Sequence, residues 1–209
     1  MEAMVRHLRD TGYLTSKKVE EAMLAIDRVY FVPDPSLAYY DRPFPIGMNQ
    51  TISAPSVVAF MLEHLQLDKG MKVLELGAGS GYNAALMSHI VGPTGKVISF
   101  DRVAELVELA KKNLASIGSP ENISLQVGDA SCGYPEEAPY DRIMVTGGIP
   151  YLDDSHPMVS QLKPGGRIVA PVGDRFFQNI VVYDKDTKSY KSVLPVMFVP
   201  IIGKCGFKG

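Results

Sequence analysis

The chain has 209 residues, of which 46% are hydrophobic, so it can bury one substantial core. Its 21 Lys and Arg residues and 23 Asp and Glu residues give a formal net charge of -2. Without a surplus of positive charge, the composition does not favour a nucleic-acid partner. Apolar runs such as residues 57–62 are much shorter than the roughly 20 residues of a membrane-spanning helix, so we expect no membrane partner.

Cysteine and histidine spacing adds expectations about location and metals. The chain begins with a charged amphipathic stretch and not with a signal peptide. Cys132 and Cys205 lie far apart, outside any Cys-x-x-Cys spacing, which predicts free thiols in a reducing compartment. We therefore expect a cytoplasmic protein. No metal is expected either, because metal-ligand spacing is absent among the four histidines His7, His64, His89 and His156.

The first third of the chain predicts helices and loops. A first helix carries Val5 and Leu8 on one face and ends at Gly12, and a second spans residues 19–26. The Pro-rich stretch 32–45 favours extended and turn conformations at the surface. A third helix is expected after Ser53-Ala54-Pro55, with Pro55 just inside its start.

From Lys72 the pattern changes to short apolar strands that alternate with longer amphipathic segments, which is typical of a parallel sheet. The predicted strands span 72–76, 96–100, 123–127, 142–146 and 167–172. Helices are predicted over 83–90 and 103–117, with a helical stretch that ends at Leu162. Residues 179–183 and 190–200 predict an antiparallel hairpin around a polar turn. We thus expect one Rossmann-like, doubly wound α/β domain with helices on both faces, comprising an N-terminal extension (1–66) and a core (67–209).

A glycine-rich turn is the most informative segment. The strand Val73–Leu76 runs into Gly77-x-Gly79-x-Gly81, where dinucleotide enzymes have Gly-x-Gly-x-x-Gly. Glu75 adds a carboxylate that suits a cationic amino-acid ligand, so the turn predicts S-adenosylmethionine. A plain packing turn is the alternative. The predicted cofactor contacts here are Glu75, Gly77, Ala78, Gly79 and Ser80.

Two further strand ends carry carboxylates. Asp101 ends the second strand about 20 residues past the glycines, where a ribose diol would lie, and Arg102 follows it. The third strand ends in Gly128-Asp129-Ala130, where a carboxylate and a backbone amide suit an adenine edge. The alternatives are that Asp101 caps the next helix and that Asp129 belongs to a loop turn.

Further motifs are spread over nearly the whole chain, namely Asp27–Pro33, Pro45–Gly47, Gln50–Pro55, the glycine loop, Gly128-Asp129, Ala138–Ile143, Leu162–Arg167, Pro171–Gly173 and Phe198–Pro200. Together they resemble the protein-L-isoaspartate O-methyltransferases. Gln50–Ser53 is the specific block. Three positions depart from the common pattern: Ser56 stands where the family often has His, Gly147-Gly148 where it has alanines, and Asn49 where it has glycine.

The resemblance implies methyl transfer from S-adenosylmethionine to the free α-carboxylate of L-isoaspartyl residues in damaged proteins and peptides. It leaves S-adenosylhomocysteine and a methyl ester that becomes a succinimide. Ser53 is then the active-site residue, and Thr51 and Ile52 line both substrate and cofactor sites. Gln50, Val199 and Pro200 then border the substrate. The alternative for Val199 and Pro200 is that they form the end of a strand at the edge of the core. We expect a monomer.

The implied substrate constrains the chemistry. An α-carboxylate with a pKa of roughly 3.3 to 3.7 is ionised at neutral pH, so no general base is needed. Ser53 would orient it, and the alternative for Ser53 is a helix N-cap. Competing functions are a methyltransferase for RNA or a small molecule, a pyridine-nucleotide dehydrogenase, and a non-catalytic module that binds S-adenosylmethionine.

Overall fold

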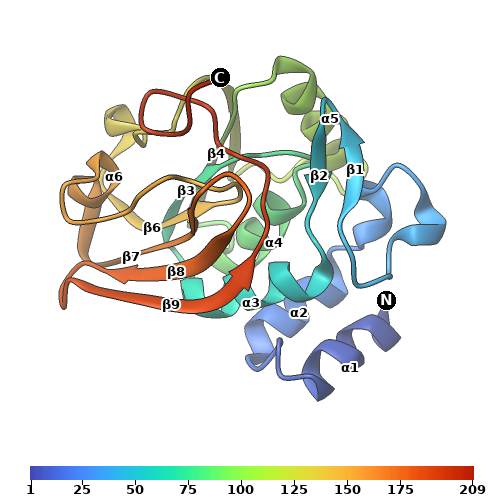
Figure 1. The fold of residues 1–209 in the computed structure, drawn as a ribbon. Helices are drawn as coiled ribbons and strands as arrows, with labels where there is room; N and C mark the ends of the chain where they lie inside the picture. Colours follow the sequence, from blue (N-terminus) through green and yellow to red (C-terminus); the bar gives the residue numbers. More distant parts are fainter.

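A seven-stranded sheet forms the centre of the computed structural model, which describes residues 1–209 (Figure 1). The strand order is β5-β4-β3-β6-β7-β8-β9. Strands β3 to β7 pair in parallel, and β8 and β9 pair antiparallel at one edge. The predicted mostly parallel α/β fold with a C-terminal hairpin is confirmed. The strands are β3 (Lys72–Leu76), β4 (Lys96–Asp101), β5 (Ile123–Val127), β6 (Tyr140–Val145), β7 (Leu162–Gly173), β8 (Gln178–Asp184) and β9 (Ser189–Val196).

Both faces of the central strands are buried. In β3, Val73 packs into a cluster on one face and Leu74 into a second cluster on the other. Neighbouring β4 divides in the same way, with Val97 on the first face and Ile98 on the second. Because successive side chains of a strand point to opposite faces, these strands read in sequence as continuous apolar runs.

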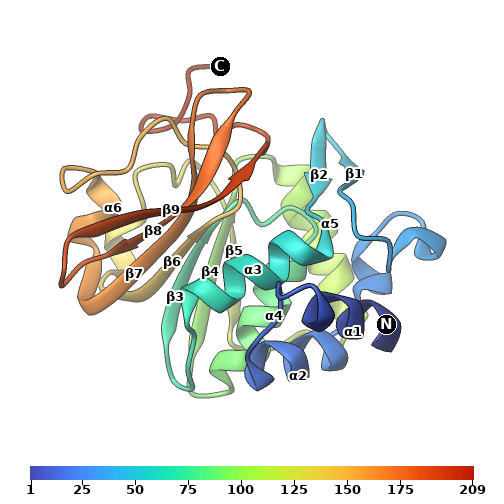
Figure 2. The same ribbon diagram turned by 60° about the horizontal axis from the view of Figure 1, so that its bottom comes forward.

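The long helices lie together on one face of the sheet (Figure 2). They are α3 (Pro55–Leu65), α4 (Tyr82–Val91) and α5 (Ala104–Ala115), with α1 (Glu2–Asp10) and α2 (Lys17–Ala25) beyond them. Met4, Val5 and Leu8 of α1 belong to the same apolar cluster as Val73. No helix is long and apolar enough to cross a bilayer.

The opposite face has a lighter cover of loops and the short helices η3 (Pro135–Glu137) and α6 (Pro157–Ser160). The predicted helical stretch up to Leu162 is therefore mostly wrong. Gly147, Gly148 and Pro150 interrupt a helix, and Asp153 closes a turn by accepting hydrogen bonds from the amide and the hydroxyl of Ser155.

A two-stranded hairpin of β1 (Phe44–Gly47) and β2 (Gln50–Ile52) occupies the end of the Pro-rich stretch, where no strand was expected. The 3-10 helix η2 (Pro35–Leu37) lies within that stretch, and the 3-10 helix η1 (Arg28–Phe31) comes directly before it. Met48 and Asn49 form the turn with φ of 49° and 56°. Positive φ at both central residues is the two-residue turn that suits a hairpin, and asparagine tolerates this conformation. This explains how Asn49 replaces the family's glycine.

The chain order of the strands creates a crevice at the carboxyl edge of the sheet. From β3 the chain continues to β4 and β5 on one side, whereas β6 pairs on the other side of β3. Ligands of open α/β sheets bind at such a switch point, beyond the carboxyl ends of the strands. The hairpin β1-β2 and residues 197–209, which we call the C-terminal segment, complete this edge (Figure 1).

Candidate active site

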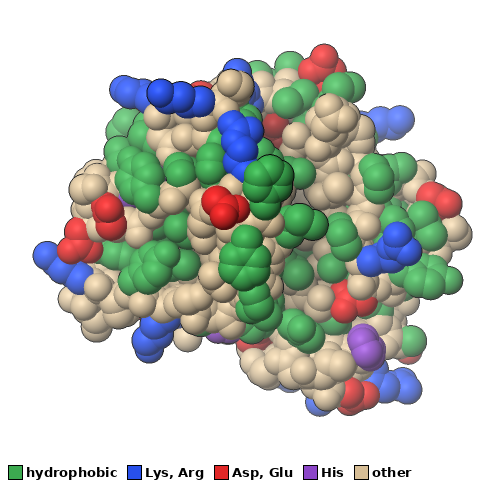
Figure 3. Space-filling model, in the orientation of Figure 1, with side chains coloured by type: hydrophobic (Ala, Val, Ile, Leu, Met, Phe, Trp, Pro, Cys, Tyr) green, Lys and Arg blue, Asp and Glu red, His purple; other side chains and the backbone are tan.

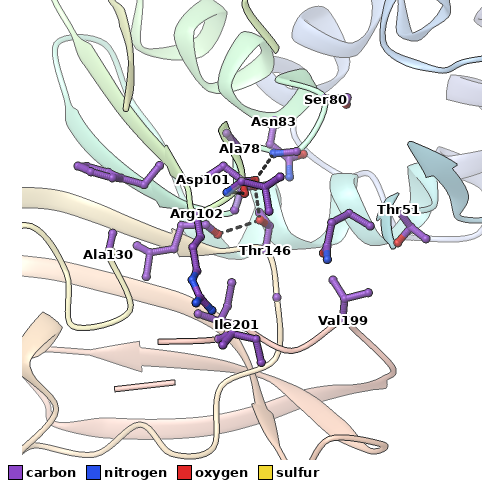
Figure 4. A pocket seen from close by; sticks show the side chains of 18 of the residues that line it. Thr51, Ala78, Ser80, Asn83, Asp101, Arg102, Ala130, Thr146, Val199 and Ile201 are labelled. Carbon is purple, nitrogen blue, oxygen red and sulfur yellow. Dashed lines mark hydrogen bonds between the residues drawn. The ribbon is translucent and has the colours of Figure 1, made fainter. Parts of the chain in front are cut away.

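A cavity of about 280 Å³ lies at this carboxyl edge. Its walls come from β2 and the residues after it, the glycine loop, the ends of β4, β5 and β6, and the C-terminal segment (Figure 4). The structure thus brings together nearly all predicted site residues, which approach the cavity from separate parts of the chain. Those that line it are Gln50, Thr51, Ile52, Ser53, Gly77, Ala78, Gly79, Ser80, Asp101, Arg102, Gly128, Asp129, Ala130, Val199 and Pro200.

The glycine loop packs tightly against the end of β6. Gly77 has a φ of 96°, and a Cβ there would lie 2.3 Å from Thr146 Oγ1, so only glycine is tolerated. The Thr146 hydroxyl lies 2.8 Å from the Leu76 carbonyl oxygen and 2.6 Å from that of Gly77. The loop is therefore both a packing turn and a wall of the cavity.

Asp101 joins the glycine loop to the start of α5. Its Oδ2 accepts a hydrogen bond from the Gly79 amide at 3.0 Å, and its Oδ1 accepts one from the Val103 amide at 3.0 Å. Val103 is the residue before α5, so Asp101 orders the entry to that helix. A carboxylate offers about four acceptor sites, and Asp101 is partly exposed in the cavity wall, so it can also accept from a ligand.

Asp129 ties the end of β5 to the C-terminal segment. Its Oδ1 accepts from the Ser131 amide at 2.9 Å and its Oδ2 from the Lys204 amide at 2.8 Å. Burial alone would raise the pKa of Asp129, but the bonds from Ser131 and Lys204 lower that pKa below its usual range. The loop-turn alternative is thus correct for the backbone, while the residue still lines the cavity.

Glu75 does not line the cavity, which corrects the expectation of a direct ligand contact. The side chain is 0% exposed inside the sheet, where Oε2 accepts from the Ser99 hydroxyl at 2.5 Å and Oε1 has no partner. Burial raises the pKa of Glu75 to about 8, so the carboxyl group is mostly neutral at pH 7. Glu75 still belongs to strand β3, whose side chains point alternately to the two buried faces of the sheet. Its carboxyl group therefore lies inside the protein and does not face the cavity beyond the end of the strand.

Ser53 lines the cavity but does not cap a helix. The N-cap of α3 is Ala54, which makes no side-chain capping bond, and the Asp41 carboxylate accepts from the Ser56 amide at 2.8 Å instead. The Ser53 hydroxyl has no hydrogen-bond partner within the protein and is partly exposed. The cap alternative is therefore wrong, and the hydroxyl is free to donate to a ligand.

Several cavity residues were not predicted. Tyr82 and Asn83 follow the glycine loop, Thr146 comes directly after β6, and Ile201 and Ile202 follow the predicted Val199-Pro200. Thr146 is the last residue of the predicted strand 142–146, so the positional argument that identified Asp101 would also have identified Thr146. Asn83 Oδ1 is buried without a partner. This oxygen can therefore accept a hydrogen bond from a bound ligand.

Cys132 and Cys205 form a disulfide, with Cα atoms 5.1 Å apart, so the prediction of free thiols is wrong. The two cysteines are 73 residues apart in the sequence, which does not indicate that they are in contact. They meet because the C-terminal segment folds back over the loop after β5. The Cys205 amide donates to Ser131 Oγ at 3.0 Å, and a Cβ on Gly203 would lie 2.2 Å from Asp129 Oδ1. The cytoplasmic expectation loses the support of free thiols.

The chemistry of the walls fits S-adenosylmethionine. Phe100, Ala130 and Ile201 give an apolar surface for an adenine ring, and Asp101 offers acceptors for ribose hydroxyls. The unpartnered Asn83 Oδ1 suits the ammonium group of the amino-acid part. The cavity lies near the lower end of ligand pockets, which measure roughly 300 to 1,000 Å³.

Comparison with known proteins agrees with this geometry. The family model described as protein-L-isoaspartate(D-aspartate) O-methyltransferase (PCMT) matches residues 1–206. Protein-L-isoaspartate O-methyltransferases from Hyperthermus butylicus and Methanopyrus kandleri are 47% and 46% identical. The alignments cover 98% and 99% of this chain, and 89% and 93% of those proteins.

Solved structures show the same relationship. A protein-L-isoaspartate O-methyltransferase aligns with a TM-score of 0.84 at 34% identity, over 98% of this chain and 67% of that one. A Plasmodium falciparum protein in complex with S-adenosyl-L-homocysteine gives a TM-score of 0.86 over 96% of this chain and 97% of its own, and its 23% identity shows the shared fold. The chain therefore belongs to the protein-L-isoaspartate (D-aspartate) O-methyltransferase family.

Proposed function

We propose that the protein uses this cavity to transfer a methyl group from S-adenosylmethionine to the free α-carboxylate of L-isoaspartyl residues in damaged proteins and peptides. The observation that supports this most directly is the Ser53 hydroxyl, which has no protein partner and lines the same cavity as Asp101 and the glycine loop. S-adenosylmethionine, when bound, supplies an electrophilic methyl group beside a sulfonium sulfur. The residues of the chain then have two tasks, which are to bind this cofactor and to orient the carboxylate.

The cofactor half of the site comprises the glycine loop and the ends of β4 and β5. We assign Asp101 to the ribose hydroxyls, and Gly128, Asp129 and Ala130 to the adenine. Arg102 is exposed at the rim and borders the same part of the cavity (Figure 4). The glycine loop lets its backbone approach the ligand closely. Glu75 supports this half from within the sheet without touching the ligand.

The substrate half lies between β2 and the C-terminal segment. We assign Thr51 and Ile52 to both halves, and Gln50, Val199 and Pro200 to the substrate backbone, because all five line the cavity. Ser53 donates to the substrate carboxylate and fixes its direction. That carboxylate is already ionised and no histidine lines the cavity, so no general base takes part. The site accelerates the reaction by orienting the carboxylate toward the methyl group. Correct alignment of reacting groups can lower a barrier by roughly 7 to 11 kcal/mol.

An assay with methyl-labelled S-adenosylmethionine tests this function. With an isoaspartyl peptide, the label is expected in a carboxyl methyl ester, which alkali hydrolyses to volatile methanol. Labelling of RNA or of a small molecule, in a form stable to alkali, would favour the competing methyltransferase. Binding of the cofactor without any transfer would favour the non-catalytic module.

Asp101→Ala is expected to weaken S-adenosylhomocysteine binding by roughly 1.5 to 3 kcal/mol, since hydrogen bonds to a charged acceptor are lost. Asp101 also holds the Gly79 and Val103 amides, so Asp101→Asn, which keeps the size of the side chain, accompanies it. Calorimetry measures the affinity, and Asp153→Ala, in a surface turn outside the cavity, is the control. Unchanged affinity in a folded Asp101→Ala variant would remove the assignment.

A further inference from the structure

Arg28 is a buried cation that makes no salt bridge, although the charge of the Asp41 carboxylate favours its charged form. It is 0% exposed, although arginine is almost never fully buried unless paired, and it takes part in no ion pair of the structure. Its Nε and Nη1 groups have no hydrogen-bond partner. Burial lowers the pKa of Arg28 to about 10, so it stays charged at neutral pH. Keeping such a group in the interior is costly.

The contacts of Arg28 lead to the active site. Its Nη2 donates to the Ser53 carbonyl oxygen at 2.7 Å. Its Cζ lies 5.2 Å from the ring centre of Tyr82, which lines the cavity. At the start of η1, Asp27 accepts from the Val29 amide at 3.1 Å and fixes the helix that carries Arg28. The guanidinium is therefore anchored behind the wall that contains Ser53.

Ser53 has no other anchor of this kind. It lies between β2, which ends at Ile52, and α3, which begins at Pro55, so neither element holds its peptide groups. No backbone amide donates to the Ser53 carbonyl, and Arg28 is its hydrogen-bond donor. The orientation of this peptide sets the direction of the Cα–Cβ bond of Ser53, and with it the position of the hydroxyl.

We propose that Arg28 is a positioning residue that acts through Ser53, holding its main chain so that the hydroxyl points into the cavity. This inference rests on the role of Ser53 proposed above. Stability alone does not explain an arginine here, because burying a charged group that forms no ion pair costs free energy, and an apolar side chain would avoid that cost. A donor that reaches the Ser53 carbonyl from behind the site does explain it.

A double-mutant cycle with Arg28→Met and Ser53→Ala tests the proposal. In the parent, Arg28→Met is expected to lower kcat/KM on an isoaspartyl peptide by roughly tenfold or more, because displacement of a catalytic group by about 1 Å can cost about 100-fold. In the Ser53→Ala background the same change is expected to cost less than about twofold, since the hydroxyl it positions is gone. Melting temperature and S-adenosylhomocysteine affinity are measured for all four proteins.

Arg142→Met is the matched control. Arg142 also donates to a backbone carbonyl, that of Leu65 at 2.7 Å, but it lies at the start of β6, away from the cavity. Equal losses from Arg28→Met in both backgrounds, or no loss in the parent, would overturn the positioning role alone. Full activity of Ser53→Ala would overturn the role of Ser53 together with it. If Arg28→Met does not fold, Arg28→Leu, which also lacks a donor, enters the same cycle with the same criteria.

Discussion

Ser53→Ala is expected to lower kcat/KM on an isoaspartyl peptide by about 10 to 150 fold while cofactor affinity stays close to that of the parent. The hydroxyl donates to a charged acceptor, and a hydrogen bond of this kind contributes roughly 1.5 to 3 kcal/mol, which converts to that range of rates. Cofactor affinity is spared because the bond goes to the substrate. The measurements are steady-state kinetics with a synthetic peptide and calorimetry with S-adenosylhomocysteine.

The structure also predicts how Ser53→Ala affects the stability of the protein. A helix cap would lose about 1 kcal/mol on replacement by alanine, but Ser53 makes no capping bond, so the melting temperature is expected to change little. Ser56→Ala is the control, since Ser56 is a neighbouring serine outside the cavity lining. A Ser53→Ala protein that keeps kcat/KM within a factor of about two and loses only stability would show that its role is structural.

Loss of the Cys132–Cys205 disulfide is expected to lower the free energy of unfolding by about 4 kcal/mol. The bond closes a loop with a sequence separation of 73, and in the chain-entropy model a loop of that length is worth about this amount. The double variant Cys132→Ser, Cys205→Ser is compared with the parent by urea unfolding. A reductant is expected to destabilise the parent equally and to leave the variant unchanged.

The same disulfide also holds one wall of the active site. Cys205 follows Ile201 and Ile202, which line the cavity, and Cys132 follows the lining residues at the end of β5. The variant is therefore expected to bind S-adenosylhomocysteine more weakly, although the Asp129 bond to the Lys204 amide keeps part of the contact. Two titratable thiols in the unreduced parent, with no effect of reductant on stability, would restore the original prediction of free cysteines.

The residues that line the cavity could be predicted from the sequence where a regular pattern of strands fixes their positions. Parallel strands end at one edge of a sheet, so the spacing of β3, β4 and β5 sufficed to gather the glycine loop, Asp101 and Asp129. The strand β3 was predicted with its exact bounds because both of its faces are apolar. The resemblance added Ser53, which lies outside these strands and carries no periodic signal.

The errors arise where contacts between distant segments decide the structure. The hairpin β1-β2 depends on a turn at Met48-Asn49 that lacks the usual glycine. The pairing of Cys132 with Cys205 depends on how the C-terminal segment folds back over β5. Arg28 lies in the motif Asp27–Pro33, but the sequence indicated no role for it, because the carbonyl oxygen that it contacts belongs to a residue 25 positions away.

On the face of the molecule seen in Figure 3, apolar side chains gather among a few charged groups. Met48 at the hairpin turn is 53% exposed and Met197 at the start of the C-terminal segment is 80% exposed, so the segments that border the cavity carry apolar side chains on the surface. Such a surface is compatible with an unfolded stretch of protein as substrate.

The most direct test of the central claim compares two peptides that differ only in one linkage, isoaspartyl against aspartyl, with labelled S-adenosylmethionine. The aspartyl carboxylate is displaced by one methylene relative to the backbone, and a misplacement of about 1 Å can cost about 100-fold in rate. We therefore predict kcat/KM at least about 100-fold higher for the isoaspartyl peptide. Equal labelling of both peptides, or labelling of neither, would contradict the account.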